Sequence, residues 1–291
     1  MTHFKKCALI FGLIIASHAA RGEVQIPDDA KIGGYALGCQ AYTFRRFTAF
    51  EAIEHTAAAG GHLIEFYPGQ TLSKEDAARK LDHNLSDEII AELKEKLQKH
   101  HVVAVNYGVV TPRTEEEWRK VFEFAKKLGL RAVTSEPSVA AMDMIEKLVK
   151  EFDVMLAIHN HPKQPNNPNY RHWDPEFILS LVKDRDARLG SCSDIGHFVR
   201  SGVKPVDALR ILKGRVISSH LKDLNEFSPR GHDVPFGTGK SDIAGVLEEF
   251  KQQGFRGNIS IEYEHDTPQL LPEVAQCFGF VRGYTTPRAT K

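Results

Sequence analysis

The sequence predicts an α/β fold, namely a (β/α)8 TIM barrel that forms a single domain. Strand-like apolar runs alternate with amphipathic runs of helical spacing, which is typical of βα units around a parallel sheet. About eight such units fit into the chain, and no Pro/Gly/Ser-rich linker divides it. No G-x-G-x-x-G motif follows the first strand, which disfavours a dinucleotide-binding fold.

The strands are predicted from short runs rich in apolar and β-branched residues. Such runs suit parallel strands that are covered on both faces. The runs are residues 36–44, 62–67, 102–110, 132–136, 155–161, 189–195, 216–222 and 258–264.

The helices between these strands are predicted from their caps. Thr114 and Glu117 have the spacing of a capping box, and Gly129 follows the last turn of the same helix. Ser241 is expected to open a later helix that Gly254 closes. This order of strands and helices places the loops after the strands at one mouth of the barrel, where such folds carry their reacting groups.

The first 20 residues have the features of a cleaved secretory signal. Lys5 and Lys6 precede an apolar run, residues 7–16, that is too short to cross a bilayer as a helix. Small residues at Ser17 and Ala19 suit signal peptidase. We therefore expect a signal peptide over residues 1–20 and a barrel domain over residues 21–291. The mature protein is expected to be secreted or periplasmic, with no membrane association after cleavage.

The charge balance argues against a nucleic-acid partner. The chain has 38 Lys and Arg and 38 Asp and Glu, so its formal net charge is zero. Nucleic-acid binders usually carry a basic excess that neutralises phosphate. We expect no nucleic-acid partner, and a metal-dependent nuclease is disfavoured for the same reason. The sequence leaves open whether copies of the chain form a homo-oligomer.

Polar and charged side chains gather at the predicted C-terminal ends of the strands. Alternate residues of a strand face the same side, so His159 with His161, or His220 with Lys222, can point together towards the barrel axis. Each such residue also has a plainer reading, as a core histidine, a helix cap or a salt bridge. The residues are Glu65, Glu136, His159, His161, Asp194, His197, His220, Lys222, Glu262 and Glu264.

These groups predict a divalent metal ion as cofactor. Charge placed inside an apolar barrel must be compensated, and a cation held by carboxylate and imidazole groups compensates it. The mixed oxygen and nitrogen donors suit Mn, Co, Zn or Mg. Other residues at the mouth are candidates for contact with a small-molecule sugar. They are Glu65, His197, Lys222 and Trp173, the last of which lies in a long polar connection.

Four motifs resemble those of the xylose isomerase-like TIM-barrel superfamily, the sugar phosphate isomerase/epimerase group. They are Asp194-Ile-Gly-His197, His220-Leu-Lys222-Asp223, Phe236-Gly237-Thr238-Gly239 and Ile261-Glu262-Tyr263-Glu264, and the resemblance covers nearly the whole mature chain. It implies that Asp194, His220 and Glu262 are metal ligands. Ketose 3-epimerases of this group take a fourth ligand from a Glu on strand five, where this sequence has His. The fourth ligand is therefore expected to be Glu136, His159 or His161.

Together, these residues and the resemblance indicate a metal-dependent sugar isomerase or epimerase. Such an enzyme removes the proton alpha to the carbonyl of a keto-sugar through a metal-stabilised enediolate. His159 or His161 is the expected base, with Glu262 as second choice, and Lys222 is expected to hold the developing oxyanion. If the intermediate expels a β-substituent, the enzyme is instead a lyase or dehydratase acting on an oxidised sugar such as a 3-keto-glycoside. A non-catalytic periplasmic sugar-binding barrel is a further alternative.

Overall fold

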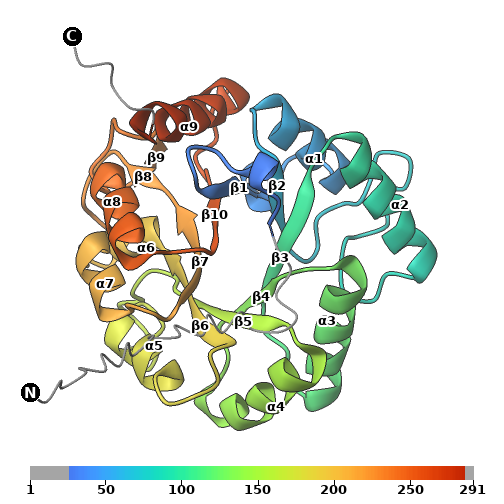
Figure 1. The fold of residues 1–291 in the computed structure, drawn as a ribbon, viewed down its shortest axis with the longest axis horizontal. Helices are drawn as coiled ribbons and strands as arrows, with labels where there is room; N and C mark the ends of the chain where they lie inside the picture. The colour runs from blue at the N-terminus through green and yellow to red at the C-terminus, as the bar shows by residue number, and fades with distance from the viewer. Residues whose placement is uncertain (1–25, 286–291) are drawn as a thin grey trace, which may run out of the picture.

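The computed structural model describes residues 26–285 of the chain. Over this range, eight parallel strands close into a barrel in the order β1-β10-β7-β6-β5-β4-β3-β2, and helices surround it (Figure 1). The predicted single-domain TIM barrel is thereby confirmed. The predicted signal peptide at residues 1–20 lies outside the described residues.

The elements follow the βα alternation expected from the sequence. The barrel strands are β1 (Ala36–Gln40), β2 (Leu63–Phe66), β3 (Val103–Val110), β4 (Ala132–Ser135), β5 (Met155–His159), β6 (Leu189–Asp194), β7 (Val216–Leu221) and β10 (Asn258–Ile261). The helices are α1 (Ala49–Ala58), α2 (Asp87–Lys99), α3 (Glu115–Leu128), α4 (Met142–Phe152), α5 (Pro175–Val182), α6 (Ile195–Arg200), α7 (Pro205–Ile211), α8 (Ile243–Gln253) and α9 (Leu270–Thr285). Three short 3-10 helices, η1 (Asp28–Ala30), η2 (Ala41–Phe44) and η3 (Val139–Ala141), and an antiparallel pair, β8 (Asp223–Leu224) with β9 (Asp233–Val234), complete the fold.

All but one of the predicted strands are shorter than predicted at the C-terminal end. After β1 the chain turns at once into η2, where the Gln40 side chain accepts a hydrogen bond from the Tyr42 amide at 2.9 Å. After β6 the chain turns into α6, which Asp194 caps. Most polar side chains of the mouth therefore lie on the last two residues of a strand or just beyond it, at the C-terminal end of the barrel.

The caps agree with the sequence, with one correction. The Thr114 hydroxyl and the Glu117 carboxylate form the predicted capping box of α3, which ends at Gly129 with φ of 79°. Helix α8 is capped by Asp242 and not by Ser241, because the buried Ser241 hydroxyl accepts a hydrogen bond from the Leu224 amide at 3.0 Å instead.

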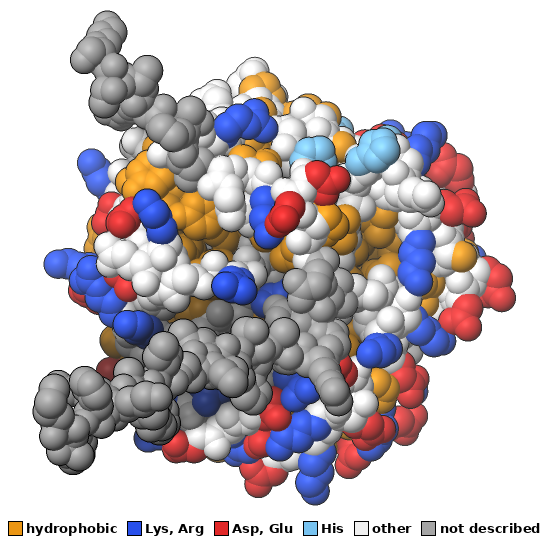
Figure 2. Space-filling model, viewed as in Figure 1, with side chains coloured by type: hydrophobic (Ala, Val, Ile, Leu, Met, Phe, Trp, Pro, Cys, Tyr) orange, Lys and Arg blue, Asp and Glu red, His pale blue; other side chains and the backbone are white. Residues whose placement is uncertain are grey.

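The helices bury their apolar faces against the barrel. Helix α3 shows the pattern, since Trp118 is only 1% exposed and Phe122 packs beside it with ring centroids 6.1 Å apart. On the face drawn in Figure 2, acidic and basic side chains are interspersed around the rim. Within residues 26–285, no helix has the length and hydropathy needed to cross a membrane.

Candidate metal centre and active site

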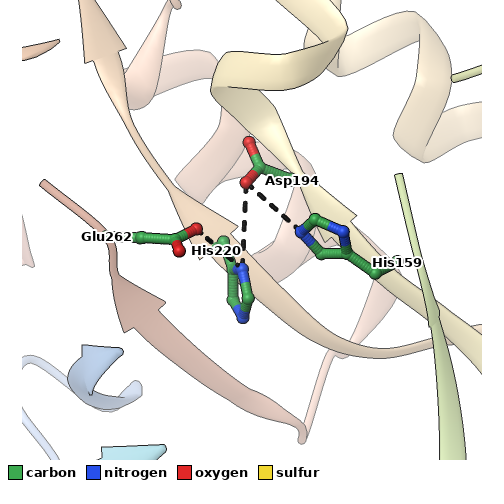
Figure 3. Close-up of side chains that lie close together, drawn as sticks. All are labelled: His159, Asp194, His220 and Glu262. Atoms are coloured by element: carbon green, nitrogen blue, oxygen red, sulfur yellow. Dashed lines mark ion pairs between the residues drawn. The ribbon is translucent and has the colours of Figure 1, made fainter. Parts of the chain in front are cut away.

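Four side chains from four neighbouring strands converge at one mouth of the barrel (Figure 3). His159 ends β5, Asp194 ends β6, His220 lies on β7 and Glu262 directly follows β10. His159 Nε2 lies 3.6 Å from Asp194 Oδ2, and His220 Nδ1 lies 3.8 Å from Asp194 Oδ2 and 3.0 Å from Glu262 Oε2. All four residues are buried. We call them the four-donor cluster.

The four atoms of this cluster that could bind a metal ion lack hydrogen bonds. His159 Nε2, Asp194 Oδ2, His220 Nδ1 and Glu262 Oε2 are buried and form no hydrogen bond in the described part of the chain, although the two carboxylate oxygens lie 3.1 and 2.8 Å from the Lys222 ammonium. Buried polar atoms normally have partners, so four orphaned atoms in one place call for an explanation. One ligand atom from each residue lies within 4.8 Å of the others.

A divalent cation fits this arrangement. Imidazole nitrogen and carboxylate oxygen bind such ions at about 2.0–2.2 Å, which places neighbouring ligands of a tetrahedral ion about 3.3–3.6 Å apart. The contacts of 3.0–3.8 Å within the cluster bracket this spacing. The cluster is therefore consistent with a divalent metal site, and its donor types do not fix which metal.

Outer carboxylates orient both histidines of the cluster. Glu65 Oε2 lies 3.0 Å from His220 Nε2 and also accepts a hydrogen bond from Ser260, while its other oxygen accepts one from Thr134. Because Nε2 of His220 faces Glu65, Nδ1 is the nitrogen that faces the cluster and is available to a cation once its proton is displaced. Carboxylate–histidine pairs of this kind are common behind metal ligands. Glu65, predicted to contact substrate, is fully buried behind His220 instead.

Glu136 lies outside the four-donor cluster and forms a second group with His159 and His161. Its Oε1 lies 3.3 Å from His159 Nδ1 and 2.5 Å from His161 Nδ1. The same oxygen accepts hydrogen bonds at 3.0 Å from the His161 amide and the Tyr170 hydroxyl. Of the three candidates for the fourth ligand, the structure thus places His159 in the cluster and Glu136 behind it.

Lys222 places a positive charge at the mouth of the barrel. Its ammonium lies 3.1 Å from Asp194 Oδ2, 2.8 Å from Glu262 Oε2 and 3.1 Å from Glu264 Oε2. Its side chain is fully buried, and its stem packs against Gly196 of α6. Gly196 makes room for it, since a Cβ at this position would lie 2.6 Å from the Cβ of Lys222.

The Asp194-Ile-Gly-His197 motif combines a helix cap with a member of the four-donor cluster. Asp194 caps α6 by accepting the His197 amide at 2.8 Å through Oδ1, which leaves Oδ2 for the cluster. The His197 ring lies beside that of His161, with centroids 5.2 Å apart. The predicted cap and the predicted ligand are thus the same carboxylate. Trp173, by contrast, meets Lys163, whose ammonium lies 4.7 Å from the centre of its ring.

The electrostatics of the cluster favour protonated histidines facing ionised carboxylates. Burial lowers the pKa of His159, but hydrogen bonds with Asp194 and Glu136 outweigh it and raise the pKa to about 9. Burial likewise opposes the charged form of His220, but the Cys192 thiol and the neighbouring carboxylates raise its pKa well above the ordinary value. A cation that binds here must therefore displace protons.

The sequence reasoning missed several supporting residues. Thr134 and Ser260 precede Glu136 and Glu262 by two positions, so strand alternation signalled that they face inward. Tyr170 gave no such signal, because it reaches Glu136 from the long connection between β5 and α5. Asp223 organises the glycine loop by accepting the amides of Gly237 and Gly239 at 2.9 Å.

Known proteins share this architecture. A family model described as a xylose isomerase-like TIM barrel matches residues 53–279. An uncharacterized protein from Parabacteroides distasonis has a crystal structure 33% identical to this chain, with a TM-score of 0.69 over 86% of this chain and 98% of that one. A D-tagatose 3-epimerase-like protein shares the fold at 19% identity, with a TM-score of 0.64 over 85% of this chain and 96% of that one. The uncharacterized protein MJ1311 of Methanocaldococcus jannaschii is 29% identical over 126 residues, 42% of this chain, and the match spans only 41% of that relative.

Proposed function

Because the chain belongs to the xylose isomerase-like TIM barrel family, we propose that it is a divalent-metal-dependent sugar isomerase or epimerase. The observation that carries the proposal is the convergence of four orphaned donor atoms at the mouth of the barrel. A cation bound there supplies Lewis acidity, which polarises a sugar carbonyl and acidifies the carbon next to it. The remaining steps fall to side chains around the cluster.

We assign proton removal to His161. Its Nδ1 donates to Glu136, which leaves Nε2 as a proton acceptor, and its side chain is 46% exposed. A base held by a carboxylate in this way is a recurring arrangement in enzymes. His159, the other predicted base, has Nδ1 beside Glu136 and Nε2 in the four-donor cluster, so neither nitrogen is free for substrate.

Lys222 is assigned a role that differs from the predicted oxyanion contact. Three carboxylates surround its ammonium, and its side chain has no exposed surface. We propose that Lys222 offsets the charge of Asp194, Glu262 and Glu264. The contacts to substrate oxygens then come from other groups.

The substrate is proposed to be an unphosphorylated sugar. The cations near the cluster already face carboxylates, since Lys222 meets Asp194 and Arg200 meets Glu264 at 2.7 Å. A phosphate would compete with these carboxylates. The signal peptide predicted at residues 1–20 supports the same proposal, because sugar phosphates are mainly cytoplasmic metabolites and we propose that this protein is exported.

A lyase acting on an oxidised sugar, such as a 3-keto-glycoside, is the second candidate. Epimerisation needs a base on one face of the substrate carbon and a proton donor on the other, whereas the proton removal of an elimination needs a base on one face only. His161 is 46% exposed, while the Glu262 side chain is 10% exposed and already faces His220. This one-sided exposure favours elimination, and the proposed chemistry up to proton removal is unchanged.

The decisive experiment incubates metal-loaded protein with keto-sugars and 3-keto-glycosides in D2O and follows carbon-bound deuterium and products by NMR. We expect exchange that EDTA and a His161→Gln substitution both remove, while the substitution leaves metal content unchanged. His265→Gln is the matched control, because His265 is exposed and lies outside both donor groups. Sugar binding without exchange, unaffected by EDTA, would instead support the sugar-binding barrel.

A further inference from the structure

A largely buried arginine contacts the Nδ1 side of His197. Arg200 ends the short helix α6, and its Nη1 lies 3.1 Å from His197 Nδ1. The guanidinium is itself held in place, because it donates to Glu264 Oε2 at 2.7 Å and to the Gly231 carbonyl at 3.1 Å. Asp233 Oδ2 lies 3.6 Å from its Nη2. Arg200 is thus fixed on three sides and presents one N–H to His197.

This contact decides where the proton of His197 resides. A guanidinium has only donors and stays protonated in proteins, so the nitrogen it meets must offer a lone pair. Nδ1 of His197 is therefore unprotonated, and the ring proton of the neutral imidazole is on Nε2.

The Lys222 ammonium does not reverse this assignment. It lies 3.4 Å from His197 Nε2, which is long for a hydrogen bond. Three carboxylate oxygens lie closer to the ammonium, at 2.8–3.1 Å, and Arg200 lies closer to the ring, at 3.1 Å from Nδ1. Nε2 of His197 is consequently free to act as a donor.

The donor points to the edge of the candidate metal centre. His197 Nε2 lies 3.5 Å from Asp194 Oδ2, an atom of the four-donor cluster. Its ring lies against that of His161, the proposed base. We propose that Arg200 is a positioning residue that holds His197 as a neutral imidazole with its proton on Nε2, so that His197 donates a hydrogen bond to an oxygen of the bound sugar. The assignment of the substrate contact rests on the proposed function, whereas the tautomer does not.

A forked, permanently charged side chain suits this position, because it must donate to His197 and to Glu264 at the same time. Arg200 connects His197 to Glu264, and Glu264 in turn contacts Lys222, so one guanidinium orders both neighbours of the cluster. A neutral donor of this kind polarises a carbonyl without carrying a full charge, as neutral histidines do in other barrel enzymes.

The first test reads the tautomer directly. Long-range proton–nitrogen NMR of uniformly labelled, full-length protein reports which ring nitrogen carries the proton, and the His197 signals are assigned by their loss in His197→Gln. We expect unprotonated Nδ1 and protonated Nε2 in the wild type. A proton on Nδ1 would overturn the inference, whatever the protein does to sugars.

The second test uses variants. Arg200→Met should shift His197 towards a mixture of tautomers, and Arg200→Lys, which keeps a donor, should restore part of the wild-type pattern. Arg188→Met is the control, because Arg188 is another partly buried arginine whose partners are Asp153 and Asp186. Retention of the wild-type tautomer in Arg200→Met would contradict the role given to Arg200. If Arg200→Met does not fold, the wild-type and Arg200→Lys spectra still decide.

Kinetics complete the test once a sugar is turned over. Arg200→Met should lower kcat/KM about tenfold or more in the wild-type background and hardly at all when His197 is already glutamine. Metal content should stay the same in all variants. An equal loss in both backgrounds would show that Arg200 acts on something other than His197.

Discussion

Replacing Glu65 by glutamine tests whether the four-donor cluster is a metal site with an outer carboxylate. Glu65 accepts hydrogen bonds from His220, Ser260 and Thr134, and it is fully buried. Glutamine has the same shape but only one acceptor oxygen. Where its NH2 faces His220 Nε2–H, two donors meet, and the imidazole is driven to protonate Nδ1, its ligand atom. The substitution therefore weakens the binding of the metal by His220 without changing His220 itself.

The expected loss in metal affinity is about 10- to 100-fold, the range found for outer partners of metal ligands. This corresponds to about 1.4–2.7 kcal/mol of binding free energy. Competition with a chromophoric chelator, using Zn, Mn and Co in turn, measures it. Glu54→Gln is the control, because Glu54 also lies near an imidazole, that of His100 at 3.9 Å, but on the surface. Equal affinity in wild type and Glu65→Gln would refute the reasoning, as would an equal loss in Glu54→Gln.

Four further predictions concern protons, charge and packing. The raised pKa of His159, about 9, and of His220 means that protons compete with the cation, so affinity should rise with pH, with a logarithmic slope approaching two between about pH 6 and 8; a flat profile would contradict this. Because the pKa of His159 is higher in the folded protein than in the unfolded chain, its protonation stabilises the ion-free protein at low pH. We expect this contribution to the free energy of unfolding to be lost between about pH 6.5 and 9, as measured by denaturant titrations. Lys222→Met removes a positive charge 2.8–3.1 Å from two ligand carboxylates, so we expect metal binding at least about tenfold tighter and a lower Tm of the ion-free protein; weaker binding would show that Lys222 supports the site. Trp118→Ala should cost about 3–5 kcal/mol of unfolding free energy, because the side chain is 1% exposed, whereas the partly exposed Trp173→Ala should cost far less; similar losses would contradict the packing argument.

The convergence of Asp194, His220 and Glu262 could be anticipated, because the C-terminal ends of barrel strands meet at one mouth whatever the loops do. Whether Glu136 or His159 is the fourth member of the cluster could not be anticipated. It depends on the path of the connection after β5, which brings Tyr170 and His161 onto Glu136. Alternation along a strand tells which side a residue faces, and not how deep it lies.

Glu65 illustrates the same point about depth. It is the next-to-last residue of β2, so it faces into the barrel below the mouth and meets His220 there. Sequence alone suggested a rim position with access to substrate. The lengths of the strands also followed loops and caps more than composition, as η2 shows for the residues after β1.

The four donors lie between residues 159 and 262, but the carboxylate behind His220 comes from position 65. That carboxylate is carried by β2, which is linked to β10 through β1. An ion that binds the closed barrel more tightly than any form in which β1 and β10 are separated would stabilise the contact between these two strands. Its free energy of binding would oppose local unfolding there. Proteolysis or hydrogen exchange at this seam would then slow as the concentration of the ion rises.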